Sequence, residues 1–503
     1  MLRLFTRAMQ AEKGGVDEGL LSTSVKNGDT NGHHVVQSQK RKVFLSPMEK
    51  GTLATLCFIN LLNYMDRFTL SGVLDQLQNY FDLNNEAAGL VQTVYTLAYM
   101  AAAVPFGYWG DRHSRRWGMG VGVGVWAAAT LLGSVVGNSF PAFLVTRGLV
   151  GVGQAAFSTI APTVISDMVA EKQRSRMLAV FYFLLPIGSG LGYIVGAGAA
   201  TVGNDWSWSL RVTPILGGIA LLLIIFVVID PPRGACEGGG SDAGVVLVSS
   251  SSYASDIWYL LRNRSFMLST MGYTSVAFVS GALAWWGPIF LASGFALQEG
   301  SDGLIHMAQV SFQFGIAMML SGIIGVPVGS LSSQWLRRIS LRTDPLICAV
   351  GLFISAPTLW GAATLATSHT WVTLIFIFIG MMTLNLSWCI VADILLYTVI
   401  PTRRAAAQGL QILISFALGA AISPYLVGLL SDIFTTGEGA AGEYEGLSRA
   451  LYFVYGVELL GGVFFLLTAI FVVRDKTACD CAMTQGKGTT VTGKKGGNEI
   501  TKS

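Results

Sequence analysis

The chain has few charged side chains for its length. Only 12% of its 503 residues are Asp, Glu, Lys or Arg, whereas a soluble domain carries about 25%. The net charge of +3 is too small to indicate nucleic-acid binding. Six cysteines do not make a disulfide framework, and the first residues lack the apolar core of a cleavable signal peptide. These shortages argue against a soluble domain, a nucleic-acid-binding protein and a disulfide-stabilised secreted module.

Apolar residues, by contrast, are abundant and occur in long runs. They make up 52% of the chain, and the mean hydropathy is +0.57. Twelve runs are long enough to cross a hydrocarbon core, which needs about 20 helical residues. Their approximate limits are 51–75, 87–109, 117–137, 141–167, 176–200, 211–230, 264–292, 304–331, 345–366, 371–399, 405–432 and 451–473. We therefore predict an all-α polytopic membrane protein with twelve transmembrane helices.

The loops between these runs differ in charge from one side to the other. One set is basic and contains Arg112, Arg115, Arg116, Lys172, Arg174, Arg176, Arg337, Arg338, Arg342, Arg403 and Arg404. The opposite set is mainly acidic and contains Asp82, Glu86, Asp205, Glu299, Asp302, Glu438 and Glu443. Lys and Arg in short loops mark the cytosolic side. With an even number of spans, we expect both termini to be cytosolic.

The chain repeats itself at an offset of about 222 residues. A glycine precedes an Arg-Arg pair by eight residues twice, from Gly107 to Arg115 and from Gly329 to Arg337. Ser-Asp at Asp167 and Ala-Asp at Asp393 recur at nearly the same offset. Two landmarks in register indicate two six-helix bundles in parallel orientation. Such halves enclose a midplane site and expose it alternately.

The repeat divides the chain into five predicted segments. These are a disordered cytosolic tail at 1–46, an N-terminal six-helix bundle at 47–230, a cytosolic linker at 231–256, a C-terminal six-helix bundle at 257–473 and a disordered cytosolic tail at 474–503.

Ionisable side chains stand inside several apolar runs. Asp66 and Arg67 lie in the first, Arg147 in the fourth and Asp393 in the tenth. A charge at the bilayer centre costs roughly 2.5–3.5 kcal/mol on insertion scales, so such residues face a cavity or one another. Adjacent helix positions point about 100° apart, so we expect Arg147 to be the partner of Asp66. We predict that Asp66, Arg67 and Arg147 surround one central cavity; the alternative is a structural ion pair that fixes helix register.

The loop after the second run holds a second group of candidate residues. We predict a cytosolic latch formed by Gly107, Asp111, Arg112, Arg115 and Arg116, in which Asp111 pairs across the two halves in one conformation. The alternative is topology alone, since positive charges hold a loop inside, and we favour that role for the arginines.

These motifs resemble the major facilitator superfamily, in the loop Gly107–Arg116 and in the fourth-run segment Arg147–Gly153. Further strings are similar to the spinster family within it: Asn60–Thr69, Ser158–Thr163, Phe181–Phe183 with Pro186–Tyr193, Val391–Tyr397 and Ile400–Arg404. The resemblance extends from about residue 50 to 475 and implies a transporter of amphipathic lipids. Family substrates are lysophospholipids and sphingosine-1-phosphate, and proton coupling is described for lysophospholipid carriers.

The residue types suit such a substrate. An anionic head group needs a desolvated cation, and arginine gives bidentate phosphate contacts. Gln154 either hydrogen-bonds the head group or satisfies Arg147. An acyl chain needs an apolar wall, to which Trp285, Trp286, Phe290 and Trp388 could contribute. The predicted substrate or gate residues are Asp66, Arg67, Arg147, Gln154, Trp388 and Asp393.

The chain departs from the spinster pattern where that pattern carries titratable residues. The replacements are Gln154, Met381, Gln408, Phe416 and Ala420. A proton-coupled carrier needs a group whose protonation changes during its cycle. We therefore expect lipid transport by alternating access without obligatory proton coupling.

Other functions remain open at this point. A carrier of a small polar organic solute has the same composition, and a lipid receptor that moves nothing would share the motifs. The spans contain no His-Glu-x-x-His, Gly-x-Ser-Gly or Gly-x-Gly-Asp motif, so we expect neither an enzyme nor a cofactor.

The predicted partners are the lipid substrate and the surrounding membrane lipids. Asp17, Leu20 and Leu21 form an acidic dileucine pattern that a trafficking adaptor could bind. We expect an endosomal or lysosomal membrane, or the plasma membrane.

Overall fold

The computed structural model describes residues 46–169, 171–231, 253–298, 307–400, 403–437 and 439–495, and the elements in these ranges are helices. The adaptor pattern at Asp17, Leu20 and Leu21 lies outside the described residues, as do most of the predicted N-terminal tail and linker.

Six long helices form the N-terminal half. They are α2 (Pro47–Thr69), α4 (Asn85–Arg112), α5 (Arg115–Gly133), α6 (Phe140–Met168), α7 (Glu171–Gly203) and α8 (Ser209–Phe226). The short elements η2 (Leu70–Val73) and α3 (Leu74–Phe81) connect α2 to α4, and η3 (Trp206–Trp208) precedes α8. Local sequence fixes the helix starts: Ser46 and Glu49 form a capping box before α2, and the Asn84 side chain accepts from the Ala87 amide at the start of α4.

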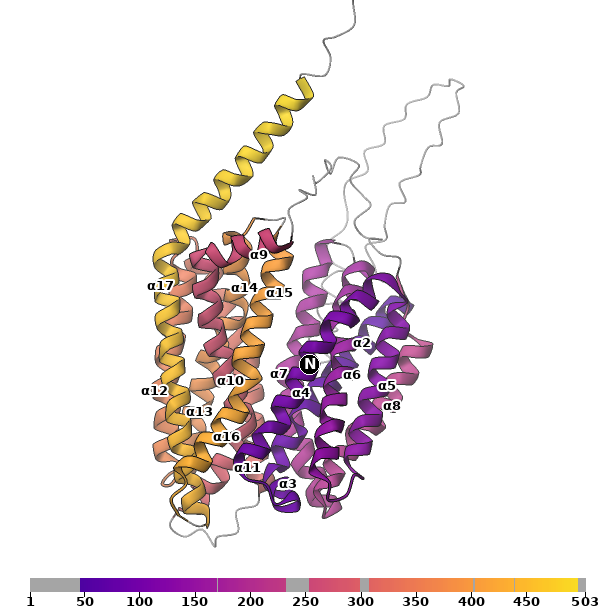
Figure 1. Ribbon diagram of the computed structural model, residues 1–503, viewed down its shortest axis with the longest axis vertical. Coiled ribbons are helices and arrows are strands. Elements are labelled where there is room, and N and C mark those ends of the chain that lie inside the picture. Colours follow the sequence, from indigo (N-terminus) through magenta and orange to yellow (C-terminus); the bar gives the residue numbers. More distant parts are fainter. Residues whose placement is uncertain are drawn as a thin grey trace, which may run out of the picture. The chain divides into compact units, whose positions relative to one another are not determined.

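The C-terminal half repeats this arrangement with two interrupted spans. Its helices are α10 (Arg264–Ala296), α11 (Met307–Leu336), α12 (Thr343–Leu365), α13 (Thr370–Asn385) with α14 (Ser387–Thr398), α15 (Arg404–Ser415) with α16 (Ile422–Phe434), and α17 (Gly439–Lys495). The π-helical segment η5 (Phe416–Ala420) joins α15 to α16 and packs against α10. Figure 1 shows the helices of each half grouped together.

The predicted spans agree with these helices. Ten helical segments among the described residues are long and apolar enough to cross a membrane. The remaining two of the twelve are α2 and α5. Asp66 and Arg67, together with two asparagines, reduce the hydropathy of α2, and α5 begins with two arginines. Both pack within the N-terminal half like the other spans, α2 against α7 and α5 against α6.

The alternating directions of the spans define two ends. Arg112, Arg115, Arg337 and Arg403 lie at one end, here called the basic end, and Asp82, Glu86, Asp205 and Asp432 lie at the other, the acidic end. The N-terminal half has its own apolar cluster, with Trp126 and Phe157 among its members. A second cluster occupies the C-terminal half and continues into η2, α3 and α4 of the N-terminal half. The apolar core is therefore continuous between the halves near the acidic end.

The internal repeat appears as a repeated ion pair. Arg115 contacts Asp167 with an N–O distance of 2.5 Å, and Arg337 contacts Asp393 at the same distance. In each half the arginine follows the second span and the aspartate lies in the last two turns of the fourth. The pairs therefore occupy equivalent places in the two six-helix bundles.

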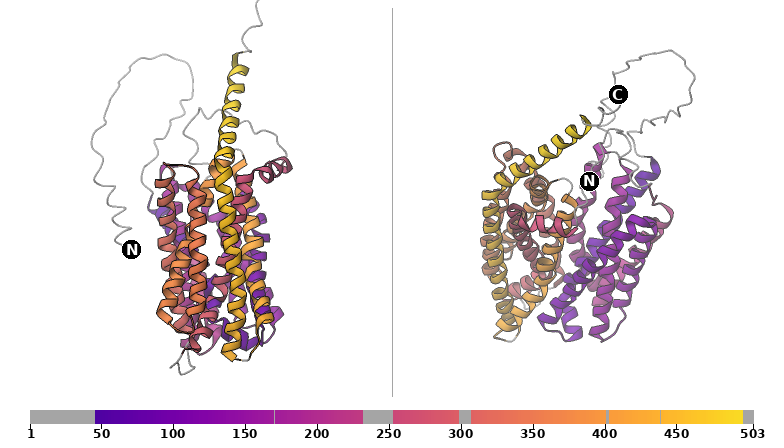
Figure 2. Two further views of the ribbon diagram at one scale, coloured as in Figure 1. Left: turned by 90° about the vertical axis from the view of Figure 1, so that its left-hand side faces the viewer. Right: turned by 45° about the horizontal axis from the view of Figure 1, so that its top comes forward.

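Two helices extend beyond the predicted segment boundaries. Helix α9 (Tyr253–Arg262) begins inside the predicted linker and lies across the ends of α14 and α15 (Figure 1). Helix α17 continues past residue 473 to Lys495 as one helix (Figure 2). Residues 474–485 contain no glycine or proline that would end it.

Candidate functional site

Asp66 is buried at the meeting point of four N-terminal helices. Its carboxylate accepts hydrogen bonds from Trp126 Nε1 at 2.8 Å, from Gln154 Nε2 at 3.0 Å and from Thr213 Oγ1 at 2.5 Å. The donors come from α5, α6 and α8, and the Asp66 side chain, which belongs to α2, lies between them. A carboxylate buried at 1% exposure needs such donors, because an unpaired charge in a low-dielectric interior is very costly.

Arg147 does not form the ion pair with Asp66 that the sequence suggested. No contact within 4.0 Å joins the two among the described ion pairs. Arg147 is 3% exposed, its guanidinium carbon lies 5.5 Å from the centre of the Phe143 ring, and its Nε and Nη2 have no hydrogen-bond partner. The two charges still attract each other without direct contact, while three neutral donors from other helices satisfy the carboxylate.

Arg67 is the second cation near this position. Its guanidinium carbon lies 5.4 Å from the centre of the Tyr95 ring and 5.9 Å from that of Phe68. Its Nε is buried without a hydrogen-bond partner. Arg67 is therefore held by aromatic faces rather than by a carboxylate.

The structure brings these three ionisable residues into one pocket. Asp66, Arg67 and Arg147 line it together with Leu70, Val91, Gln92, Tyr95 and Val150, and its empty volume is about 230 Å³. Arg67 Nε, Arg147 Nε and Arg147 Nη2 are buried nitrogens of these lining residues that have no hydrogen-bond partner. They can donate to an anion.

Gln154 connects the carboxylate to the pocket wall. Its Nε2 donates to Asp66, and its Oε1 accepts a hydrogen bond from the Tyr95 hydroxyl. A glutamate here could not donate to Asp66 when ionised and would bring a second negative charge beside it. Of the two roles considered for Gln154, satisfying Arg147 is not the one the structure shows, because its partners are Asp66 and Tyr95.

Two predicted site residues lie elsewhere. Trp388 packs edge-on against Tyr273, with ring centres 5.4 Å apart, and Asp393 pairs with Arg337 at the basic end. Neither lines the pocket that holds Asp66.

The predicted latch residues make contacts inside the N-terminal half. Arg115 pairs with Asp167, Arg116 Nε donates to the Ile224 carbonyl at 3.1 Å, and Arg112 stacks on Tyr108 at 4.7 Å. A Cβ added at Gly107 would meet no neighbour within 4 Å. The side chain of Asp111 lies outside the described part, so its pairing across the halves remains a prediction.

A second, apolar pocket lies inside the C-terminal half. Helices α10 to α13 and α17 line it, with Phe290, Phe314, Met381 and Tyr455 among the contributing residues, and its empty volume is about 300 Å³. Phe290 was expected in an apolar wall, whereas Phe314 and Tyr455 were not identified from the sequence. Neither of the neighbouring tryptophans Trp285 and Trp286 lines this pocket.

Glu458 is a buried titratable residue that the sequence analysis overlooked. It lies in α17 at 0% exposure, and neither carboxyl oxygen has a hydrogen-bond partner. A charge buried in such surroundings is very costly unless it is paired. The sequence could have identified this residue, because Glu458 is the one acidic residue of the apolar run 451–473.

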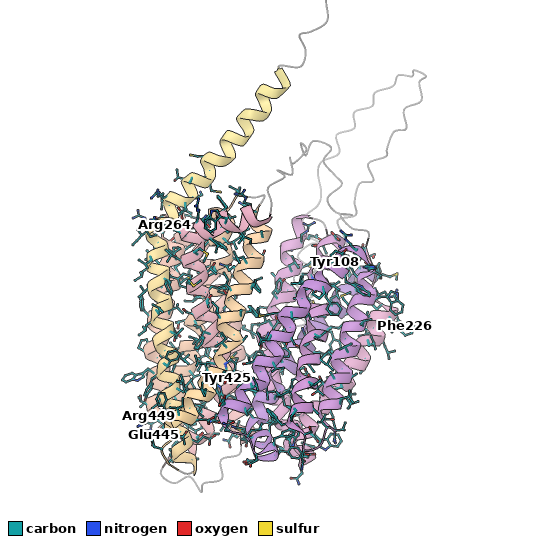
Figure 3. All side chains as sticks on the ribbon, in the orientation of Figure 1. Tyr108, Phe226, Arg264, Tyr425, Glu445 and Arg449 are labelled. Atoms are coloured by element: carbon teal, nitrogen blue, oxygen red, sulfur yellow. The ribbon has the colours of Figure 1, made fainter. Side chains whose placement is uncertain are left out.

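Several contacts between the halves lie toward the acidic end. The Asp432 carboxylate, at the end of α16, accepts from the backbone amides of Asn85 at 3.1 Å and Glu86 at 2.8 Å. It thereby caps the N-terminus of α4 from the opposite half, where backbone N–H groups lack helical partners. The Tyr425 hydroxyl donates to Glu86 at 2.6 Å, and Figure 3 shows Tyr425 on the side of the C-terminal half that faces the N-terminal half.

The two halves also meet along α7 and α11. The Tyr193 hydroxyl donates to the Ala284 carbonyl at 2.6 Å, and Ser311 Oγ donates to the Gly72 carbonyl at 3.1 Å. Both contacts lie toward the acidic end of their helices. The hydrogen bonds between the halves thus extend from the acidic end to the level of the pocket, where Thr93 Oγ1 donates to the Ala421 carbonyl at 2.6 Å.

Comparison with known proteins agrees with this architecture. The model of the Major Facilitator Superfamily matches residues 56–424. Protein spinster of Drosophila melanogaster is 48% identical over 475 residues, covering 84% of this chain and 77% of that protein. Protein spinster homolog 1 of Homo sapiens is 46% identical over 440 residues, covering 86% of this chain and 83% of that protein.

Solved structures share the fold. A bacterial homolog to the human lysosomal transporter Spinster, in an inward-facing and unoccupied conformation, superposes with a TM-score of 0.74 at 19% identity; the match covers 86% of this chain and 99% of that one. The occupied form of that homolog gives a TM-score of 0.73 at 18% identity, with the same coverage.

Proposed function

This chain belongs to the spinster family of the major facilitator superfamily, and we propose that it carries lysophospholipids or sphingosine-1-phosphate across a membrane by alternating access. Family membership makes it a multi-pass membrane transporter and not an enzyme. In such a carrier the two halves rock about a site near the membrane midplane.

The paired arginines of the Asp66 pocket carry this proposal. Arg67 and Arg147 present N–H groups without partners, and their charges are not matched by a carboxylate in contact. Guanidinium groups bind phosphate oxygens through two parallel hydrogen bonds, which are stronger than bonds between neutral groups. The shared chemical feature of the proposed substrates is a phosphate on a single-chain lipid.

The apolar pocket lined by Phe290 and Phe314 supports a lipid tail rather than a small polar solute. A polar solute gains little from a pocket whose lining side chains are apolar apart from Tyr455. Each pocket is smaller than a whole lipid, so the substrate would need the halves to separate further around it.

The topology assigns a direction to the observed closure. If the basic end is cytosolic, as its arginines indicate, contacts at Asp432 and Tyr193 close the side away from the cytosol. The structure then corresponds to an inward-facing conformation. We propose both termini in the cytosol and an endosomal, lysosomal or plasma membrane as the location, with Asp17, Leu20 and Leu21 as the adaptor signal.

Transport by Arg147→Ala tests the proposal. Cells or vesicles containing the variant receive labelled lysophosphatidylcholine or sphingosine-1-phosphate, and initial rates are compared at matched surface expression. Loss of charge-assisted hydrogen bonds is expected to reduce transport efficiency by about tenfold to a hundredfold. Arg449→Ala is the matched control, because Arg449 forms an exposed pair with Glu445, labelled in Figure 3, that contributes little.

The outcomes separate the competing functions. Normal flux through a well-expressed Arg147→Ala protein would contradict the proposal that Arg147 binds the phosphate. Binding of labelled lipid without flux through the wild-type chain would indicate a receptor. Flux of a polar organic solute that no lysolipid inhibits would indicate a small-solute carrier.

A further inference from the structure

Tyr95 contacts both the Asp66 network and Arg67. It is 5% exposed, its hydroxyl donates to Gln154, and its ring lies 5.4 Å from the Arg67 guanidinium carbon. No motif of the sequence singled out this residue. Its contacts place it between the buried Asp66 network and the Arg67 guanidinium.

The backbone at Tyr95 is fixed by close helix packing. A Cβ added at Gly151 of α6 would lie 2.3 Å from the Tyr95 carbonyl oxygen, so the glycine allows α4 and α6 to touch at this turn. The tyrosine ring therefore projects from a position that cannot shift easily toward or away from the pocket.

The amide of Gln154 fixes the direction of the hydrogen bonds. The Asp66 carboxylate can only accept when ionised, so Gln154 must present its NH₂ group to it. The amide oxygen then points to Tyr95 and must receive the hydroxyl proton. Flipping the amide would set its oxygen against the carboxylate and break that bond, so the amide keeps this orientation and the tyrosine hydroxyl acts as the donor.

We propose that Tyr95 is a positioning residue for substrate binding, because it holds the Arg67 guanidinium against its ring and connects it through Gln154 to Asp66. This inference rests on the proposed function, in which Arg67 receives the phosphate. A long arginine side chain otherwise loses considerable rotamer freedom on binding an anion, and fixing it in advance reduces that cost.

Steady-state transport of labelled lysophosphatidylcholine by three variants tests this role. Tyr95→Leu removes ring and hydroxyl and is expected to raise KM by about tenfold, the effect of losing a partly desolvated cation–π contact. Tyr95→Phe keeps the ring and is expected to raise KM by about threefold. The maximal rate should change by less than about twofold in both, since the residue orients the binding group and does not drive the rocking of the halves.

Tyr99→Leu is the matched control. Tyr99 lies one turn further along α4, with its ring centre 6.4 Å from that of Tyr95, and has no described contact with Arg67. Its KM should stay within about twofold of wild type. If Tyr95→Leu fails to reach the membrane, Tyr95→Met replaces it in the series.

A double-mutant cycle separates positioning from general damage. In the Tyr95→Leu background, Arg67→Ala should raise KM by much less than it does alone, because the arginine is already misplaced. The inference would be overturned if the effects of the two changes on KM were multiplicative, or if both Tyr95 variants had the wild-type KM. In either case, impaired transport by Arg147→Ala would still support the phosphate site. Normal transport by Arg147→Ala and Arg67→Ala would instead overturn the proposed function itself, and the inference with it.

Discussion

At the scale of single residues, sequence reasoning found the charged groups of the pocket but not all of their partners. Asp66, Arg67 and Arg147 could be identified because each is costly in an apolar run. The hydrogen-bond donors to Asp66 could not, because Trp126, Gln154 and Thr213 stand 60, 88 and 147 residues away along the chain. Only the packing of α2, α5, α6 and α8 brings them together.

The donor at Thr213 gives a stability prediction. Thr213→Val keeps the shape of the side chain and removes the hydroxyl that donates to Asp66 Oδ1. A buried carboxylate that loses a donor is destabilised, by about 1–3 kcal/mol for the unmade hydrogen bond. We expect a lower midpoint in thermal unfolding of the purified protein.

Thr130→Val provides the matched control, because the Thr130 hydroxyl is buried without a hydrogen-bond partner. Replacing it should leave the thermal midpoint unchanged or raise it slightly. Equal destabilisation by the two substitutions would mean that the bond to Asp66 contributes nothing specific.

At the scale of helices, the contact between α4 and α16 shows how the two halves are held together near the acidic end. Asp432 caps α4 across the two halves, and two glycines allow the close approach. A Cβ at Gly89 would lie 2.3 Å from the Pro424 carbonyl oxygen, and one at Gly428 would lie 2.2 Å from that of Asn85. The sequence could indicate both helices but not their contact, since glycine and aspartate near a helix end have many other uses.

Gly89→Ala is therefore expected to favour separation of the halves at the acidic end. The added methyl group would overlap with backbone atoms, which cannot move aside as a flexible side chain can. The readout is labelling of Ser311→Cys by a membrane-impermeant maleimide added from the acidic side. Ser311 is fully buried and bonded to Gly72 across the halves, so its labelling rate should rise when they separate.

The labelling requires a background in which the native cysteines, such as the exposed Cys481, are replaced. Gly409→Ala is the control, because a Cβ at Gly409 meets nothing within 4 Å. An unchanged labelling rate in Gly89→Ala would show that this contact does not control opening.

At the scale of the whole molecule, the twelve spans and the repeat could be predicted from the sequence. The spans follow from the lengths of the apolar runs, and the repeat follows from motifs that recur at a constant spacing along the chain. The repeated pairs Arg115–Asp167 and Arg337–Asp393 give the repeat a structural counterpart. The second copy has serine where the first has Asp111, and Ser333 donates to Asp344 at 2.7 Å, while Asp344 also contacts Arg337. The contribution of a carboxylate from α12 to this cluster cannot be inferred from alignment of the halves.

Energy coupling is the remaining property of the whole molecule that the structure bears on. Gln154 joins Asp66 to Tyr95 through a neutral amide, so the network is complete without a proton that comes and goes. Glu458 is buried and does not line the pocket that holds Asp66. It is not one of the positions at which the chain replaces a titratable residue of the spinster pattern. We expect wild-type flux in vesicles to follow the lipid gradient and to vary little with an imposed pH gradient.

Gln154→Glu should make transport depend on pH. The substitution places two carboxyl groups at hydrogen-bond distance, and they cannot both ionise without strong repulsion. At low pH a shared proton reproduces the bridge that the amide makes, so flux should approach wild type. As the pH rises the proton leaves, the carboxylates repel each other and flux should fall.

Gln408→Glu is the control, since Gln408 is exposed and an added carboxyl there stays hydrated. Lipid accumulation by the wild-type chain above its own gradient, abolished by a protonophore, would contradict uncoupled transport and direct attention to Asp66, Asp393 and Glu458 as proton carriers.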